Sequence, residues 1–151
     1  MPTTVHIRNA NSADLVPMTG LLNSLFSIEK DFSADGDRQM RGLRMLLGNP
    51  RACILVAEEQ GEVVGMCTGQ IVISTAEGGP SILVEDVVVR SDRQGEGIGT
   101  MLMEAVRRFA DENRATRLQL LADCDNTPAL NFYNKTGWNK TSLICLRKTN
   151  A

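Results

Sequence analysis

The chain has 151 residues, of which 42% are apolar, and 16 Lys and Arg residues against 18 Asp and Glu residues give it a formal charge of −2. This length and composition are typical of one domain with a buried core, so we treat residues 1–151 as a single domain. The sequence has no apolar run near the roughly 18 residues of a membrane-spanning helix and no charged and apolar leader, so we expect a cytoplasmic protein that does not bind a membrane. It has no excess of positive charge, so we expect no nucleic acid as partner.

The first third of the chain predicts a strand followed by two helices. The strand covers 5–8. Apolar residues then recur at helical spacing after Ser12 and again after Asp35, and each of these side chains can cap a helix. The second helix is expected to end at the breaker Gly48-Asn49-Pro50. The stretch between the two helices is acidic, with the carboxylates Glu29, Asp31, Asp35 and Asp37.

The remaining elements alternate between strands and helices. Strands are expected over 53–58 and 63–73, joined by a turn at Gln60-Gly61, and a long apolar strand follows over 81–90. The clearest helix spans 98–113, because its apolar residues form one stripe. The last expected elements are a strand over 118–122, a helix over 128–135 and a strand over 143–147. This alternation favours an α/β or α+β fold.

Cysteine and histidine usage narrows the chemistry. Cys53, Cys67, Cys124 and Cys145 are widely spaced, so we interpret them as reduced thiols, and Cys124 as a small buried residue. His6 is the only histidine and falls in the first predicted strand. A zinc site, or a catalytic device that pairs histidine with serine or cysteine, is therefore not expected, and we predict no metal.

A glycine-rich loop joins the long apolar strand to the clearest helix. Its three alternate glycines allow a sharp turn with outward N–H groups, and the helix adds the positive end of its dipole. The loop predicts a phosphate or pyrophosphate site, with a ligand-free tight turn as the alternative. It lacks the lysine of a Walker A loop, and Thr100 stands where a dinucleotide fingerprint needs glycine. The candidate residues are Gln94, Gly95, Glu96, Gly97, Ile98, Gly99 and Thr100.

Segments on both sides of this loop, together with the loop itself, resemble a known family. They are Val84-Glu85-Asp86-Val87-Val88-Val89, Gln94-x-x-Gly97-x-Gly99 and Asn126-x-x-Ala129-Leu130-Asn131-Phe132-Tyr133-x-x-x-Gly137-Trp138. Together they resemble the GNAT superfamily of acetyl-CoA-dependent N-acetyltransferases, most sharply over 81–138. The likeness implies one α+β acyltransferase domain, with a mixed, mostly antiparallel central sheet of six to seven strands, about four flanking helices and splayed central strands.

The resemblance also implies how acetyl-CoA is held as a co-substrate. Free backbone groups of Val87, Val88 and Val89 pair with the pantetheine arm, which requires this strand to diverge from the strand at 118–122. The pyrophosphate lies on the N–H groups of residues 95–100. Asn126 and Ala129 match positions that contact the co-substrate in relatives. Many relatives have a basic residue where this chain has Glu96, and a carboxylate near phosphates is unfavourable unless it points to solvent.

Tyr133, the only tyrosine of the chain, is the candidate general acid. A phenol with a pKa of about 10 can protonate a leaving thiolate without being ionised at neutral pH. Relatives use a tyrosine at this motif position in that role. The alternative is an aromatic residue of an amphipathic helix that packs on the sheet.

Two adjacent carboxylates, Glu85 and Asp86, interrupt the long apolar strand. Alternation points them to opposite faces, and each needs a cation, a donor or water. One interpretation is a structural ion pair, for example with Arg117 or Arg147. The other is an acceptor site, because the run is locally similar to polyamine and glucosamine-6-phosphate acetyltransferases. That likeness implies a catalytic or substrate-binding Glu85 and a substrate-binding Asp86. The acidic stretch 29–37 is either part of the same site or a solvated loop with helix caps.

The resemblance therefore implies an enzyme that transfers acetyl from acetyl-CoA to the primary amine of a small molecule by direct attack, with no metal and no acyl-enzyme. Two alternatives keep the fold: a non-catalytic acyl-CoA-binding or regulatory module, and a transferase for protein amino groups. A dinucleotide-binding redox enzyme is the weakest alternative. The resemblance also leaves room for a homodimer in which 143–147 supplies an edge strand.

Overall fold

The computed structural model describes residues 4–28 and 35–150. Its contacts divide the chain into two units, Met1–Leu120 and Leu121–Ala151. Within the part of the chain that is described, no helix combines the length and the apolar character that crossing a membrane requires. One acyltransferase domain over 1–151 stays a prediction.

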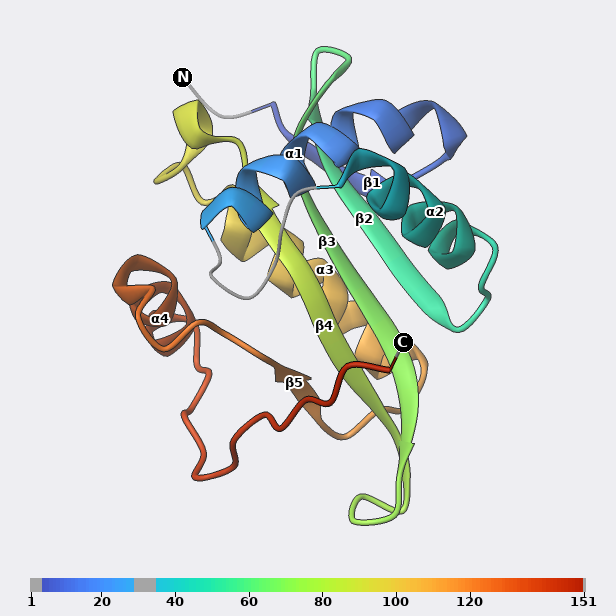
Figure 1. Ribbon diagram of the computed structural model, residues 1–151, viewed down its shortest axis with the longest axis vertical. Coiled ribbons are helices and arrows are strands. Elements are labelled where there is room, and N and C mark those ends of the chain that lie inside the picture. The colour runs from blue at the N-terminus through green and yellow to red at the C-terminus, as the bar shows by residue number, and fades with distance from the viewer. Residues whose placement is uncertain (1–3, 29–34, 151) are drawn as a thin grey trace. The chain divides into compact units, whose positions relative to one another are not determined.

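The larger unit holds nearly all of the secondary structure (Figure 1). Its strands are β1 His6–Asn9, β2 Ala52–Glu59, β3 Glu62–Ser74, β4 Gly79–Val89 and β5 Leu118–Leu120. Its helices are α1 Leu15–Ile28, α2 Gly36–Leu47 and α3 Ile98–Glu112, with short 3-10 turns at Ser12–Asp14 and Ser91–Arg93. The strands and helices predicted before residue 121 are therefore confirmed, although β5 ends earlier than expected and the first cap is Asn11 instead of Ser12.

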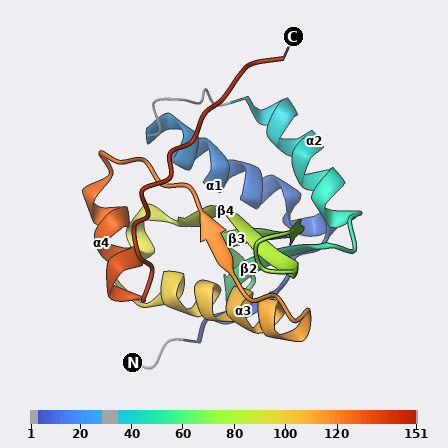
Figure 2. The same ribbon diagram turned by 90° about the horizontal axis from the view of Figure 1, so that it is seen from below.

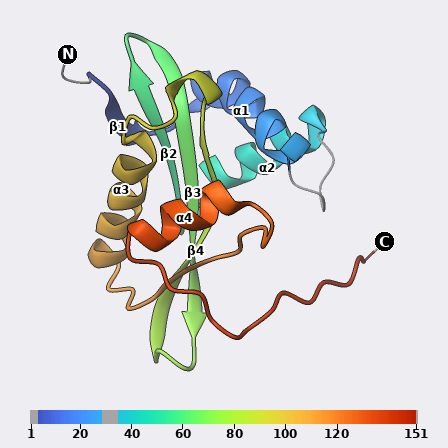
Figure 3. The same cartoon turned by 90° about the vertical axis from the view of Figure 1, so that its left-hand side faces the viewer.

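The strands form one mixed sheet in the order β1-β2-β3-β4-β5. Neighbours from β1 to β4 pair in an antiparallel fashion, whereas β4 and β5 pair in parallel. The parallel pair is possible because the chain crosses over through α3 between these two strands. Helices α1 and α2 cover one face of the sheet and α3 covers the other (Figure 2 and Figure 3).

Helix α3 packs close to the sheet because glycines on β3 leave room for its side chains. A Cβ added to Gly65 would lie 3.3 Å from Ile98 and Leu102, and a Cβ added to Gly69 would lie 3.1 Å from Ile82. Glycine at these two positions therefore allows the close approach of side chains to the β3 backbone. On the opposite face, the buried core includes Met18, Leu22, Leu43, Val56 and Met66.

The smaller unit contains the predicted helix but not the predicted strand. Helix α4 spans Thr127–Lys135. Residues 143–147 form no strand, and Leu143, Ile144 and Leu146 are 80%, 79% and 87% exposed. The apolar pattern was misleading because a strand also needs a neighbour to pair its backbone groups, and the described part of this unit has none. The predicted count of six to seven strands is therefore wrong: the described residues form a sheet of five.

Candidate functional site

The loop between β4 and α3 turns at two glycines. Gly95 and Gly97 have φ values of +81° and +85°, in the left-handed region that other residues rarely adopt. Gly97 is also the N-cap of α3, and no side chain in the described part of the chain caps this helix. An added Cβ at either glycine would meet nothing within 4 Å, so the outer side of the loop is open.

The first turn of α3 offers unused N–H groups. The first bond of the helix runs from the N–H of Met101 to the carbonyl of Gly97, at 3.1 Å. The N–H groups of residues 98–100 therefore have no partner inside the helix, and no acceptor for them occurs among the described residues. Free N–H donors and the helix dipole are what a helix N-terminus offers to an anion, and a phosphate site at this loop stays a prediction.

The carboxylate of Glu96 is turned to a neighbouring arginine. Arg93 donates from Nε and Nη2 to the two Glu96 oxygens, at 2.9 and 3.1 Å. The remaining terminal nitrogen of Arg93 lies 3.0 Å from Oε1 of Glu59, the last residue of β2. The negative charge of Glu96, which would be unfavourable near phosphates, is therefore paired with the guanidinium of Arg93.

A bulge interrupts β4 beside this loop. Thr68 and Met66 of β3 pair with Glu85 and Val88, so β4 has two residues where β3 has one. The first of these two residues, Asp86, has a φ of +55°. The expectation that Glu85 and Asp86 simply alternate between faces is therefore wrong, because a residue has been inserted into the strand.

The bulge decides which backbone groups of β4 are free. Ile82 donates its N–H toward β5, whereas Arg90, an even number of residues later, donates toward β3, both at 2.8 Å. In a regular strand these two residues would point the same way, so the inserted residue reverses the order. As a result, Val87 and Val89 direct their N–H and C=O groups away from β3.

Among the residues that the structure describes, no strand pairs with these groups on the other side. The pairing of β4 with β5 ends at Val84, opposite Leu120. Val88 is paired with Met66 of β3, and the carbonyl of Val89 accepts from Gln94 Nε2 at 3.3 Å. The prediction that all three valines have free backbone groups therefore fails for Val88, which is paired with β3. The groups that face away from β3 and have no hydrogen-bond partner among the described residues are both groups of Val87 and the N–H of Val89.

A buried threonine holds the bulge in place. Thr68 is 1% exposed, and its hydroxyl lies 3.1 Å from the carbonyl oxygen of Glu85 and 3.2 Å from Oδ2 of Asp86, so its one proton is shared between two acceptors. Asp86 thus has a structural role in the bulge. Arg117, one of its suggested partners, instead lies 3.9 Å from Glu77.

Glu85 differs from Asp86 in having an exposed and unengaged side chain. Ile82 and Val84 face α3, as the contact of Ile82 with Gly69 shows, so Glu85 faces the side of α1 and α2. Among the described residues, its carboxylate makes no hydrogen bond or ion pair. It can therefore accept a hydrogen bond from a cationic ligand.

The acidic stretch between the first two helices is only partly described. Glu29 and Asp31 lie outside the described residues. Asp35 caps α2 by accepting from the N–H of Arg38 at 3.2 Å, which confirms the helix-cap interpretation at this position. Asp37 is exposed in the first turn of α2, where the dipole favours a negative charge.

The smaller unit carries the second motif. Asn126 caps α4 by accepting from the N–H of Ala129 at 3.3 Å, so the two motif residues are joined by one bond. Tyr133 is half-buried, with its ring edge-on to Phe132 at 5.3 Å and to Trp138 at 6.0 Å. The motif tyrosine is thus held by its aromatic neighbours.

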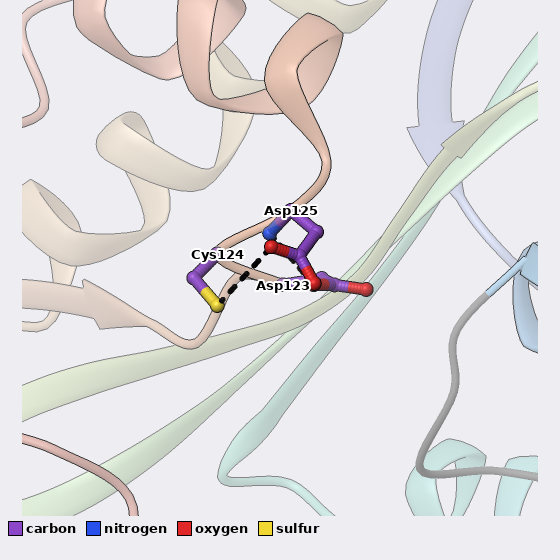
Figure 4. Close-up of side chains that lie close together, drawn as sticks. All are labelled: Asp123, Cys124 and Asp125. Atoms are coloured by element: carbon purple, nitrogen blue, oxygen red, sulfur yellow. Dashed lines mark hydrogen bonds between the residues drawn. The ribbon is translucent and has the colours of Figure 1, made fainter.

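The cysteines divide between the two units. Cys53 and Cys67 are buried in the sheet, and burial raises the pKa of Cys53 to about 11 and that of Cys67 further. Cys124 and Cys145 are exposed, so the buried position predicted for Cys124 is wrong. The reason is a turn in which Asp123 accepts from the N–H of Asp125 at 2.9 Å, which leaves Cys124 at its outer side (Figure 4).

Sequence reasoning missed the Thr68 clamp and the bridge from Arg93 to Glu59. Thr68 gave a weak signal, as a hydroxyl inside a buried apolar strand. The bridge gave none, because its two ends lie on different elements far apart in the chain.

Comparison with known proteins places the chain in a family. Residues 19–138 match the acetyltransferase (GNAT) family. The chain is 26% identical over 136 residues to the uncharacterized N-acetyltransferase YhfO of Bacillus subtilis strain 168, covering 90% of this chain and 91% of that protein. It is 30% identical over 92 residues to a putative ribosomal protein bS18 alanine N-acetyltransferase of the same organism, covering 61% of this chain and 57% of that protein.

Solved structures share the fold over nearly the whole chain. A transcriptional regulator from Bacillus halodurans C-125 has a TM-score of 0.84 at 25% identity and covers 97% of this chain and 99% of its own. The aminoglycoside N-acetyltransferase AAC(6')-Iy in complex with CoA has a TM-score of 0.86 at 16% identity and covers 100% of this chain and 98% of its own. Since the family match spans most of the chain, this protein belongs to the GNAT acetyltransferase family and is an acetyl-CoA-dependent N-acetyltransferase.

Proposed function

We propose that this enzyme acetylates the primary amine of a small molecule by direct attack of that amine on acetyl-CoA. The observation that carries the proposal is the continuous segment from β4 to α3, in which a bulge frees strand-edge groups and a glycine loop frees helix N–H groups. The pantetheine arm of acetyl-CoA can pair with a free strand edge, and its pyrophosphate can accept hydrogen bonds from N–H donors, so the co-substrate matches both features.

The residues that would hold acetyl-CoA follow from this geometry and from the motif. Val87 and Val89 offer backbone groups to the pantetheine arm, and residues 98–100 offer N–H groups to the pyrophosphate. Asn126 and Ala129 are assigned by the motif alone. The co-substrate supplies the thioester whose carbonyl carbon the amine attacks.

Two side chains supply the proton transfers in this proposal. Glu85, exposed and unengaged among the described residues, binds the ammonium group of the acceptor or takes its proton through water. Tyr133 gives its phenolic proton to the sulfur as the carbon–sulfur bond breaks. The new carbon–nitrogen bond forms in the same reaction, so no covalent enzyme intermediate and no metal are needed.

A protein amino group is the second candidate acceptor. It is favoured by the 30% identity to the putative ribosomal protein alanine N-acetyltransferase. The local similarity of the Val84–Val89 run to polyamine and glucosamine-6-phosphate acetyltransferases favours a small amine. Family membership favours an enzyme over a non-catalytic module, and it replaces the dinucleotide redox alternative. A homodimer and a cytoplasmic location stay predictions.

The test is release of free thiol from acetyl-CoA with a panel of amines. The panel contains a polyamine, an amino sugar, an aminoglycoside, an amino-acid amide and a peptide that begins with alanine. Turnover with a small amine, and a Glu85→Gln variant that raises the KM for that amine without changing the Kd for CoA, would support the proposal. Turnover with the peptide alone would establish the second candidate instead.

A further inference from the structure

One arginine holds the glycine loop between two carboxylates. Arg93 binds both oxygens of Glu96 within the loop and reaches Glu59 at the end of β2. Its side chain is only 17% exposed, so the bridge is partly sheltered from solvent. Hydrogen bonding from Arg93 lowers the pKa of Glu59, so this end of the bridge is ionised at neutral pH.

The same bridge controls a charge next to the free N–H groups. Glu96 stands between the two left-handed glycines and directly before the residues that begin α3. Without Arg93, its carboxylate would be a free negative charge in a loop that otherwise attracts anions. Arg93 pairs with that carboxylate and also with Glu59 of β2, so the three groups together carry one negative charge instead of two.

We infer that Arg93 is a positioning residue for acetyl-CoA, which acts through Glu96: it holds that carboxylate in an ion pair and so prevents it from repelling the pyrophosphate. The inference rests on the proposed function, because it takes residues 98–100 as the pyrophosphate site. It also explains how this chain tolerates an acidic residue at a loop position where many relatives have a basic one.

The experiment is a calorimetric measurement of the Kd for CoA in four forms of the protein. Arg93→Met should weaken binding about five- to tenfold, the effect of one uncompensated charge near the phosphates. Glu96→Gln should bind at least as tightly as the wild type. The double variant R93M/E96Q should recover to within about twofold of the wild type, because the two changes are coupled.

A merely structural role would give the opposite double-variant result. If Arg93 only braced the fold, R93M/E96Q would bind CoA as weakly as R93M, and that outcome would overturn the inference. If R93M does not fold, Arg93→Lys decides: it keeps the charge and should bind CoA within about threefold of the wild type, whereas a loss of about tenfold or more would count against the inference.

A matched control lies on α3. Arg107 is also placed between two carboxylates, Glu104 and Asp111, on the exposed side of the helix. Arg107→Met removes the same charge and should leave the Kd for CoA unchanged. The proposed function fails separately: CoA would then not bind the wild type, or Gly97→Val would leave its Kd unaltered. If the wild type binds CoA and Gly97→Val raises the Kd, weak CoA binding by R93M/E96Q rejects only the role of Arg93 and leaves the proposed function standing.

Discussion

The segment from β4 to α3 and the C-terminal unit carry the two family motifs in different ways. In the first, backbone groups are the functional groups, and buried or paired side chains fix them: Thr68 holds the bulge and Arg93 holds the loop. In the second, a side-chain hydroxyl on a short helix is the candidate group, and the rings of Phe132 and Trp138 pack edge-on against that side chain. Binding of the co-substrate and the proton transfer should therefore respond to different substitutions.

The largest expected effect is on the proton transfer. Tyr133→Phe removes only the hydroxyl and should lower kcat by about 10²–10⁴-fold if the phenol is the general acid, while the Kd for CoA stays unchanged. Steady-state kinetics and calorimetry would separate the two quantities. Phe132→Leu is the control, because it disturbs the same aromatic cluster and keeps the hydroxyl. Near-normal turnover in Tyr133→Phe would leave this ring with a packing role only.

Next in size is an effect on binding. Gly97→Val forces a branched side chain into a left-handed position and should disturb the N–H groups that follow, raising the Kd for CoA by about tenfold or more. Gly78→Val is matched, since Gly78 has a φ of +73° and open space around it but lies in the β3–β4 turn. Equal Kd values for the two variants would contradict the assignment of the loop.

A smaller effect should appear in stability. Thr68→Val keeps the shape of the side chain and removes the donor that holds the bulge, at a cost of about 1–3 kcal/mol in the free energy of unfolding. Thr116→Val is matched, because the Thr116 hydroxyl donates to Glu77 on the surface, at 2.7 Å, and its loss should cost less than about 0.5 kcal/mol. Denaturant unfolding measures both, and similar losses would argue against a clamp at Thr68.

The smallest expected effect is on acid stability of the larger unit. Arg8 donates to both oxygens of the buried Asp14, at 2.7 and 2.9 Å, and thereby lowers the pKa of that carboxyl. Because its pKa is lower in the folded state than in the unfolded state, where it is about 3.9, this carboxyl stabilises the fold at pH values above the unfolded pKa. The stabilisation is lost as the pH falls through the pKa of the folded state. Asp14→Asn should therefore cost about 1 kcal/mol at pH 7 and less below pH 4. A cost independent of pH would contradict the ion pair.

Much of the fold followed from local pattern. Helical spacing of apolar residues predicted α1, α2 and α3. The strand at 143–147 could not be judged locally, because a strand depends on a neighbour. The bulge was equally hidden, because two carboxylates in an otherwise apolar strand do not by themselves show that Asp86 is an inserted residue.

The site was predictable as a motif and not as a set of contacts. The glycines of the loop predicted a left-handed backbone conformation, because other residues rarely adopt it. The carboxylate of Glu96 seemed unfavourable near phosphates because the sequence does not show its pairing with Arg93. That arginine also reaches Glu59, which lies on a distant strand. Contacts of this kind depend on the folded arrangement of elements, which spacing along the chain does not encode.

The four cysteines allow the two units to be labelled selectively, because the buried pair and the exposed pair lie in different units. A maleimide dye reacts with accessible thiolates, so in the native state it should attach to Cys124 and Cys145, both in the C-terminal unit, and spare Cys53 and Cys67. Delayed labelling of the latter two would then time the opening of the sheet. Native thiols thus suffice to watch the two units separately, without engineered tags.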